Sequence, residues 1–428
     1  MFCATCGAKV PDGAKFCPAC GASFAQIPAA APPSAAAPPP APTPAAAPQP
    51  STPAAPQRRR RTLPLALLAV AVVAVLGVSG FLAWRALSGG GATQDERIAT
   101  NAVLANGTST SAQGYDFYWD PDAGALMRAR TDGSDAPMAL AKQADEYGYL
   151  RNIHVLGDRV YFLTSSYSGD GADRLRCVSI DGTDEKTVFS APATDDGDTG
   201  YIYCAYPVGD KIYTVVDLGS AEEGPSSCAV YRFGPEGEDQ ERLARIEGVP
   251  GGSFAMTPEA IYYASDGDLY ALNYEEGAPS RIWRSQTGRA TQPFVYYGRL
   301  WVWEGDLDYQ SGTLLSMKPD GSDVREVMSP EAGAGMWPCG VYNGTLLLQA
   351  RANKTSDDKC LIVGVSLNDG HEVMRLELEP GWGYPYVADG GDHMVVAMTA
   401  VDTMGAALGS YSVGPDGSVI ATHKPYDN

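Results

Sequence analysis

An uncharged apolar run from Leu63 to Trp84, preceded by four arginines, constrains this chain more than any other feature. As a helix its 22 residues would measure about 33 Å, enough to cross a hydrocarbon core of about 30 Å. A helix is the expected form, because backbone polar groups in lipid must be satisfied within their own segment. Arg58 to Arg61 stand before the run and only Arg85 follows it. We therefore expect a single-pass cell-membrane protein with a cytoplasmic N-terminus and an extracytoplasmic C-terminal domain.

Composition changes sharply along the chain. Residues 1–91 carry a net charge of +6 and residues 92–428 a net charge of −26, so the acidic C-terminal part should repel nucleic acid. Residues 28–56 include 12 prolines, which favours an extended tether over a folded domain; a Pro-rich docking ligand is the alternative. The expected segments are a small domain at 1–26, a disordered Pro/Ala-rich linker at 27–57, a basic stop signal at 58–62, a transmembrane helix at 63–85, a flexible linker at 86–98 and a repeat domain at 99–428.

Four cysteines in the first 20 residues form two Cys-x-x-Cys pairs, Cys3 with Cys6 and Cys17 with Cys20. Two residues between thiolates allow both sulfurs to bind one Zn²⁺, and the glycine after each pair permits the tight turn. So short a segment has no adequate core, and metal binding should supply most of its folding free energy. We expect a structural zinc ribbon with no open coordination position, and a cytosolic protein as its partner. A disulfide pair or another thiophilic metal is the alternative.

Beyond residue 100 a pattern of four short strands recurs. Its marker is an aromatic or aliphatic second strand, centred on positions 117, 161, 213, 262, 301, 347 and 395, which are 39 to 52 residues apart. Asp-Gly turns recur between the third and fourth strands, at Asp132, Asp181, Asp320, Asp369 and Asp416. Such turns need the positive φ of glycine. The spacing predicts an all-β fold, a β-propeller with seven blades, six or eight being alternatives. A pair of irregular sandwiches is the competing fold.

In a four-stranded meander the first-to-second and third-to-fourth turns share one face, and the other connections share the opposite face. Aromatic residues gather in the segments that enter the first strands, and variable connections on a rigid scaffold often bind ligands. We select Tyr149, Tyr201, Trp337, Trp382 and Tyr384 as candidate ligand-binding residues for a protein or glycan. The alternative is that these rings fill the wedges between blades.

The outer cysteines leave two readings open. Cys204 and Cys228 open the first and third strands of one repeat, and Cys339 and Cys360 do so in another. A disulfide within each pair would have to span the intervening strand, so buried free thiols are the alternative.

The sequence contains no recognisable catalytic motif. Its four histidines, His154, His371, His393 and His423, are scattered, and no nucleophile elbow, P-loop or zinc-protease motif is present. We therefore expect a non-catalytic extracytoplasmic module that binds protein or glycan, and not an enzyme. The alternatives are an envelope polysaccharide hydrolase or lyase that uses carboxylates in the propeller mouth, and a transmembrane sensor.

The order of a zinc ribbon with Cys3, Cys6, Cys17 and Cys20, one apolar run and a Tyr/Asp-Gly repeat resembles that of bacterial membrane-anchored envelope proteins with a propeller-like domain. The resemblance implies structural zinc and membrane attachment. It implies no particular activity.

Overall fold

The computed structural model describes residues 92–424, except 143–148, 166–170, 196, 199, 220–226, 248–252, 286–289, 306–311, 330–334, 351–358, 380–382 and 400–406. Within them the chain forms one α-helix followed by 28 β-strands. The predicted zinc ribbon, Pro/Ala-rich linker and apolar run at Leu63–Trp84 all lie outside the described residues. Among the helices in the described part, none is long and apolar enough to cross a membrane.

The strands form four-stranded antiparallel units, which we call blades, numbered in chain order. The first four blades are β1 (Ser109–Ala112), β2 (Tyr115–Asp120), β3 (Ala125–Arg130) and β4 (Met138–Lys142); β5 (Tyr149–Leu156), β6 (Arg159–Ser165), β7 (Arg174–Ser179) and β8 (Lys186–Ser190); β9 (Ile202–Val208), β10 (Lys211–Asp217), β11 (Ser227–Phe233) and β12 (Glu241–Glu247); and β13 (Phe254–Met256), β14 (Ala260–Ser265), β15 (Asp268–Asn273) and β16 (Pro279–Trp283).

The last three blades continue the same order. They are β17 (Ala290–Tyr296), β18 (Arg299–Gly305), β19 (Gly312–Met317) and β20 (Arg325–Met328); β21 (Met336–Tyr342), β22 (Thr345–Ala350), β23 (Cys360–Ser366) and β24 (Glu372–Leu378); and β25 (Tyr384–Asp389), β26 (Met394–Thr399), β27 (Ala407–Val413) and β28 (Val419–Lys424).

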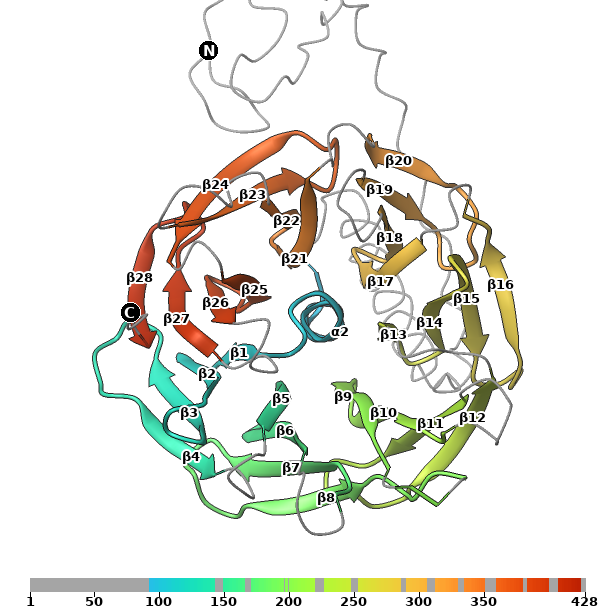
Figure 1. The fold of residues 1–428 in the computed structure, drawn as a ribbon, viewed down its shortest axis with the longest axis horizontal. Coiled ribbons are helices and arrows are strands. Elements are labelled where there is room, and N and C mark those ends of the chain that lie inside the picture. Colours follow the sequence, from blue (N-terminus) through green and yellow to red (C-terminus); the bar gives the residue numbers. More distant parts are fainter. Residues whose placement is uncertain are drawn as a thin grey trace, which may run out of the picture. The chain divides into compact units, whose positions relative to one another are not determined.

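The blades are arranged in a ring, with their first strands innermost (Figure 1). Blades 6 and 7 are joined into one eight-stranded sheet by a single parallel bridge between Gly340 and Val387. Each blade is continuous in sequence, so blade 1 and blade 7 meet without exchanging a strand. The architecture is all-β and consistent with the predicted propeller, and seven blades lie within the described residues.

The second-strand marker is placed as predicted. Positions 117, 161, 213, 262, 301, 347 and 395 all fall in second strands, β2, β6, β10, β14, β18, β22 and β26. Many of these strands are buried along most of their length, as in β26, where every residue is buried. The core lies between neighbouring blades and includes Phe117 and Phe162 in one cluster and Trp301 and Trp303 in another. Aromatic packing between blades therefore explains the marker.

Helix α2 (Gln94–Leu104) occupies the centre of the ring (Figure 1) and contacts the first strands of blades 3 to 7. Thr93 begins it with a capping box: its hydroxyl accepts from the Glu96 amide at 3.1 Å, and its own amide donates to Glu96 Oε2 at 2.8 Å. Its residues from Ile98 to Leu104 are buried. This helix was not predicted from the sequence, and its residues straddle the expected boundary between the flexible linker (86–98) and the repeat domain (99–428).

The third-to-fourth turns, most of them Asp-Gly, also make contacts between blades. In six blades the glycine of the third-to-fourth turn packs against the fourth strand of the preceding blade. A Cβ added at Gly237, Gly321 or Gly370 would collide with a backbone carbonyl oxygen of that strand. Gly133 of blade 1 packs in the same way against Ala421 of blade 7. We call these contacts interblade turn contacts.

The five outer cysteines are all buried free thiols, so neither of the two disulfides considered from the sequence is formed. Cys204 lies opposite Val215 and Cys228 opposite Asp217, with β10 between them. Burial raises the pKa of the Cys204 and Cys228 thiols to about 12, which keeps them protonated and unreactive at neutral pH.

Candidate functional site

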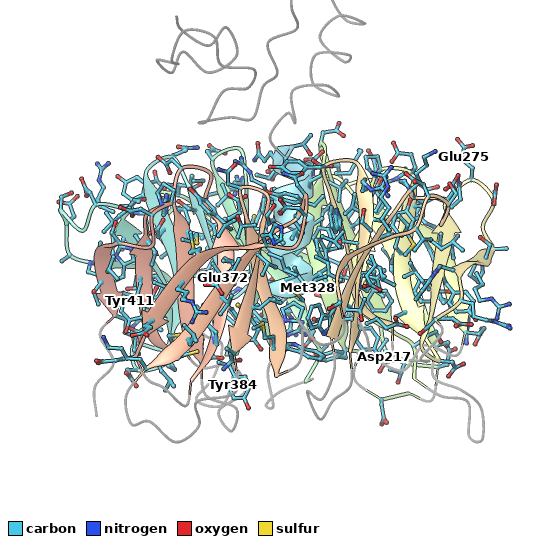
Figure 2. All side chains as sticks on the ribbon, turned by 90° about the horizontal axis from the view of Figure 1, so that it is seen from above. Asp217, Glu275, Met328, Glu372, Tyr384 and Tyr411 are labelled. Carbon is cyan, nitrogen blue, oxygen red and sulfur yellow. The ribbon has the colours of Figure 1, made fainter. Side chains whose placement is uncertain are left out.

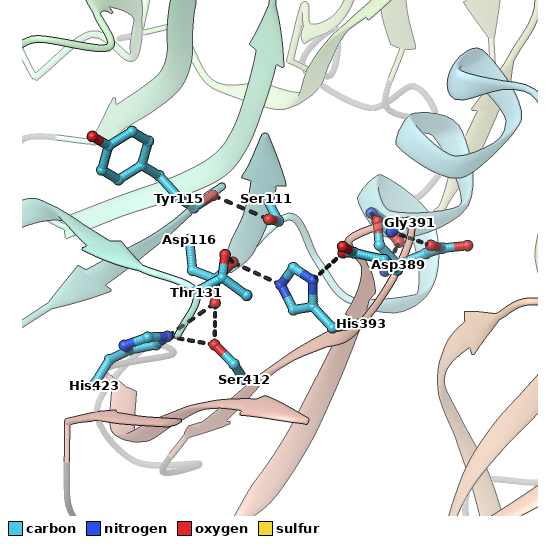
Figure 3. A network of polar contacts seen from close by, with 11 residues as sticks. Ser111, Tyr115, Asp116, Thr131, Asp389, Gly391, His393, Ser412 and His423 are labelled. Carbon is cyan, nitrogen blue, oxygen red and sulfur yellow. Dashed lines mark hydrogen bonds and ion pairs between the residues drawn. The ribbon is translucent and has the colours of Figure 1, made fainter. Parts of the chain in front are cut away.

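A buried polar cluster joins the first blade to the last (Figure 3). At its centre is Asp116 of β2, whose carboxylate faces His393, just before β26, and Ser412 and His423 of β27 and β28. His393 Nε2 lies 2.8 Å from Asp116 Oδ1, and His423 Nε2 lies 2.9 Å from Oδ2. The Ser412 hydroxyl donates to the same Oδ2. All four side chains are buried. We call this group the closure cluster.

The closure cluster holds opposite charges. The two ring nitrogens of His393 face carboxylates, Nε2 that of Asp116 and Nδ1 that of Asp392, at 2.8 and 2.7 Å. Ionised carboxylates only accept hydrogen bonds, so this arrangement favours a proton on both nitrogens, the imidazolium form of the ring. Burial alone would raise the pKa of Asp116, but hydrogen bonds from His393 and His423 and the His393 charge hold it well below its usual range. Burial by itself would lower the pKa of His393, but the carboxylates of Asp116 and Asp392 outweigh this effect and raise it.

Serine, histidine and aspartate in contact invite comparison with a catalytic triad. In a triad the acid and the nucleophile bind different nitrogens of one histidine. Here Ser412 Oγ and Asp116 Oδ2 both lie near Nε2 of His423, at 2.6 and 2.9 Å. The serine also donates to the carboxylate itself, and its side chain is fully buried. This geometry binds blade 1 to blade 7 and offers no nucleophile to a substrate.

The four histidines are scattered in the sequence, but the fold brings two of them together, contrary to expectation. His393 and His423 share one carboxylate, although they lie 277 and 307 positions from Asp116. His154 has neither of its ring nitrogens hydrogen-bonded within the described part of the chain, and burial lowers its pKa to about 3. His371 follows the turn of blade 6, where its amide donates to Asp369.

A second link between blades 1 and 7 lies near the surface. Lys424 donates to Asp120 Oδ1 at 2.6 Å and to Asp122 Oδ2 at 2.7 Å. Asp122 is largely exposed, so the solvent screens this pair and it contributes less than the buried closure cluster.

The candidate ligand-binding aromatics lie where first strands begin. Tyr201 directly precedes β9, Trp337 is the second residue of β21 and Tyr384 the first of β25. Tyr384 lies on the face of the ring opposite Glu275, which belongs to a third-to-fourth turn (Figure 2). We call the face of the third-to-fourth turns the turn face and the opposite one the loop face. Tyr149 begins β5, and Trp382 lies outside the described residues.

These aromatics share a face but belong to separate blades. Tyr201 is 38% exposed. The Arg151 guanidinium lies 4.7 Å from the centroid of its ring, and the centroid of the Tyr203 ring lies 5.4 Å from it. Arg151 also forms a buried ion pair of 2.8 Å with Asp173. Trp337 is partly buried against a core cluster. Their role in ligand binding remains a prediction.

Solved structures with similar folds include a puromycin-hydrolyzing peptidase of Mycobacterium tuberculosis, at 13% identity and a TM-score of 0.48, covering 77% of this chain and 56% of that one. An acylaminoacyl peptidase of Pyrococcus horikoshii has 10% identity and a TM-score of 0.46, covering 76% and 54%. An oligogalacturonate lyase in complex with manganese has 10% identity and a TM-score of 0.45, covering 69% and 83%. The chain thus spans about half the length of the two peptidases.

These comparisons contradict two predictions, that the chain is a non-catalytic module and that it is not an enzyme. Two peptidases and a lyase are among the similar structures. The lack of a catalytic motif in the sequence was therefore no ground for excluding catalysis, and we do not retain that exclusion. At these identities the likeness concerns the fold alone, and no activity is transferred to this chain.

No curated protein matches the chain. Within the described residues no group of three or more histidine, cysteine or acidic side chains could hold a metal ion. Cys3, Cys6, Cys17 and Cys20 lie outside them. Residues 2–24 match the zinc-ribbon domain family, a range that contains all four cysteines. The first 24 residues therefore include a zinc-ribbon domain, which implies structural zinc binding.

Proposed function

We propose that this protein is anchored in the cell membrane by Leu63–Trp84, with its zinc ribbon in the cytosol and its propeller outside. The ribbon would bind a cytosolic protein, and the loop face of the propeller would bind a protein or glycan. The separation of a thiolate zinc site from an acidic β-domain by an apolar run and four arginines supports this topology.

The position of α2 is the observation that favours the loop face as the ligand-binding face. The helix begins at the turn face, where Glu96 Oε1 accepts from the Gly298 amide in the first-to-second turn of blade 5 at 2.6 Å. Residues 85–93 separate it from the apolar run, and nine extended residues reach at most about 30 Å. A connection of this length that enters at the centre of the turn face would keep that face, on average, nearer the bilayer than the loop face.

Membrane topology can be tested with single cysteines, because the five native outer thiols are buried. Ser134 is an exposed residue of the turn face and Lys359 an exposed residue near β23 at the loop face. A maleimide that cannot cross membranes should label the S134C and K359C variants in intact cells and leave the parent chain unlabelled. Labelling of both variants only after lysis would contradict the proposed topology.

The orientation of the propeller is tested with the same variants. A fluorophore attached to S134C should be quenched more strongly by nitroxide-labelled lipid headgroups than one attached to K359C, in liposomes that contain the full chain. Equal quenching, or the reverse order, would contradict a membrane-facing turn face.

Ligand binding at the loop face is tested by photocrosslinking in cells. A benzophenone amino acid replaces Tyr201, which directly precedes β9 on the loop face. The matched control places it at Glu275 on the turn face (Figure 2). We expect adducts from position 201 only, and mass spectrometry of these adducts distinguishes protein from glycan. Adducts from position 275 alone, or from neither position, would contradict recognition at the loop face. Cleavage of the captured ligand would reveal turnover in the same experiment.

A further inference from the structure

One of the seven blades lacks an interblade turn contact. The third-to-fourth turn of blade 4 contains Gly277, and no atom of the described residues lies within 4 Å of a Cβ added there. In its place Tyr274 stacks on Tyr213 of blade 3, with ring centroids 5.5 Å apart and planes inclined by 28°. At this end of the junction between blades 3 and 4, two stacked rings therefore take the place of a turn that packs against β12.

A groove of about 560 Å³ lies at this junction. It is within the range of volumes that hold small ligands. All its lining residues are described, and they come from the turns and strand ends of blade 3 and from Pro258 of blade 4. The lining combines an apolar part with charges of both signs: Val208, Gly209, Tyr213, Phe233 and Pro258, and Asp210, Lys211, Arg232, Asp239 and Glu241.

Two of these charges correspond to residues that form ion pairs in other blades. Arg159 and Arg299 begin the second strands of blades 2 and 5, and each pairs with an aspartate two residues after the turn glycine, Asp184 and Asp323. The Arg299–Asp323 distance is 3.0 Å.

In blade 3 the equivalent residues are Lys211 and Asp239. Asp239 has the same left-handed backbone, with φ of 54°, against 55° for Asp184 and 54° for Asp323. Within the described part of the chain Lys211 and Asp239 form no ion pair, with each other or with any other group. Arg232 and Glu241, in contrast, pair with each other at 2.6 Å.

We propose that the groove binds a small zwitterion with an apolar body, the chemistry of a free amino acid or a short peptide. Its ammonium group would bind Asp239, its carboxylate would bind Lys211, and its apolar body would lie along Tyr213 and Pro258. A ligand that carries both charges satisfies Lys211 and Asp239 at once, which an anion or a cation alone does not, and it leaves Asp210, which also lines the groove, as a second carboxylate for its ammonium group. Membrane topology and the loop face play no part in this proposal.

The test uses the full chain in detergent micelles and measures dissociation constants by calorimetry. L-phenylalanine, L-leucine and glycyl-L-phenylalanine are the zwitterionic probes. L-phenylalaninamide lacks the carboxylate and N-acetyl-L-phenylalanine lacks the ammonium group. We expect each of these losses to weaken binding about tenfold, the typical effect of one hydrogen bond to a charged group. Tighter binding of the dipeptide than of phenylalanine would identify a peptide ligand, and the reverse order a free amino acid.

Two substitutions assign the charges. The K211Q variant should bind phenylalanine and its amide equally, and D239N should bind phenylalanine and its acetyl derivative equally. Asparagine tolerates the left-handed backbone at position 239. D266N is the matched control, because Asp266 has φ of 50° and lies outside the groove. The proposal is wrong if no zwitterion binds saturably in the millimolar range, or if both variants retain the discrimination of the parent chain.

Discussion

The interblade turn contacts give the sharpest prediction, because the chain contains its own control. Gly321 in the turn of blade 5 has φ of 79°, and a Cβ there would collide with the Ile282 carbonyl of blade 4. Gly277 in the turn of blade 4 has φ of 69°, and a Cβ there would have no atom of the described part of the chain within 4 Å. Alanine at either position is strained by its left-handed backbone at a cost of about 1–2 kcal/mol. Only G321A must also displace a neighbouring strand.

Displacement of well-packed backbone typically costs about 1–3 kcal/mol. We therefore expect G277A to lower the free energy of unfolding by about 1–2 kcal/mol and G321A by about 2–5 kcal/mol. Urea titration of the full chain in detergent, followed by tryptophan fluorescence, measures both values. The difference between the variants isolates the contact between blades, since the backbone strain is common to both. Equal losses in G277A and G321A would refute the reasoning.

Three further predictions concern the closure cluster, the buried histidine and the ribbon. The D116N variant should lower the free energy of unfolding by about 3–5 kcal/mol, because it leaves the His393 imidazolium without its buried partner. The exposed D132N variant, measured in parallel by urea titration, should change the free energy of unfolding little. The pKa of His154 is about 3 in the fold and 6.5 when unfolded, so below pH 6.5 protons bind preferentially to the unfolded chain and lower the stability of the fold. The H154L variant should therefore remove about 2 kcal/mol of the stability difference between pH 7.5 and pH 5. An unchanged pH profile of stability in H154L would exclude this origin. C17S should abolish bound zinc, measured by atomic emission, while the unfolding of the propeller stays unchanged, and stoichiometric zinc in this variant would contradict a four-cysteine site.

The pH dependence of the closure cluster has two limits of opposite sign. The pKa of Asp116 is lowered in the fold, so its contribution is present above the unfolded value and is lost as the pH falls through the folded one. The pKa of His393 is raised, so its contribution is complete below about pH 6.5 and is lost as the pH rises through the folded value. The closure cluster therefore stabilises the ring most in mildly acidic solution.

The repeated strands could be predicted because their signals are local. A second strand such as Arg159–Ser165 is recognisable from its run of buried aromatic and β-branched residues, and a turn such as Asp320-Gly321 from the backbone it needs. The same glycines also pack against a neighbouring blade, where a Cβ would collide. Both the turn and this contact require glycine, and a single sequence does not distinguish the two requirements. The Asp-Gly repeat was thus located correctly and explained only in part.

Helix α2 and the closure cluster escaped prediction for different reasons. The capping box of Thr93 and Glu96 was a readable signal, but the helix has only 11 residues and its burial depends on the ring around it. The contact of Asp116 with His423 joins residues 307 positions apart, and it exists only because the last blade returns to the first. No spacing rule connects such residues.

Closure of the ring depends on side chains, because blades 1 and 7 exchange no strand. The buried charges of the closure cluster form one link between these blades. Helix α2, which leads directly into blade 1, forms another: Asn101 Oδ1 accepts from the Asp389 amide at 2.9 Å, and its Nδ2 donates to the Asp389 carbonyl at 3.3 Å. Asp389 ends β25, only four residues before His393. A displacement of α2 would therefore reach the closure cluster through the turn between β25 and β26.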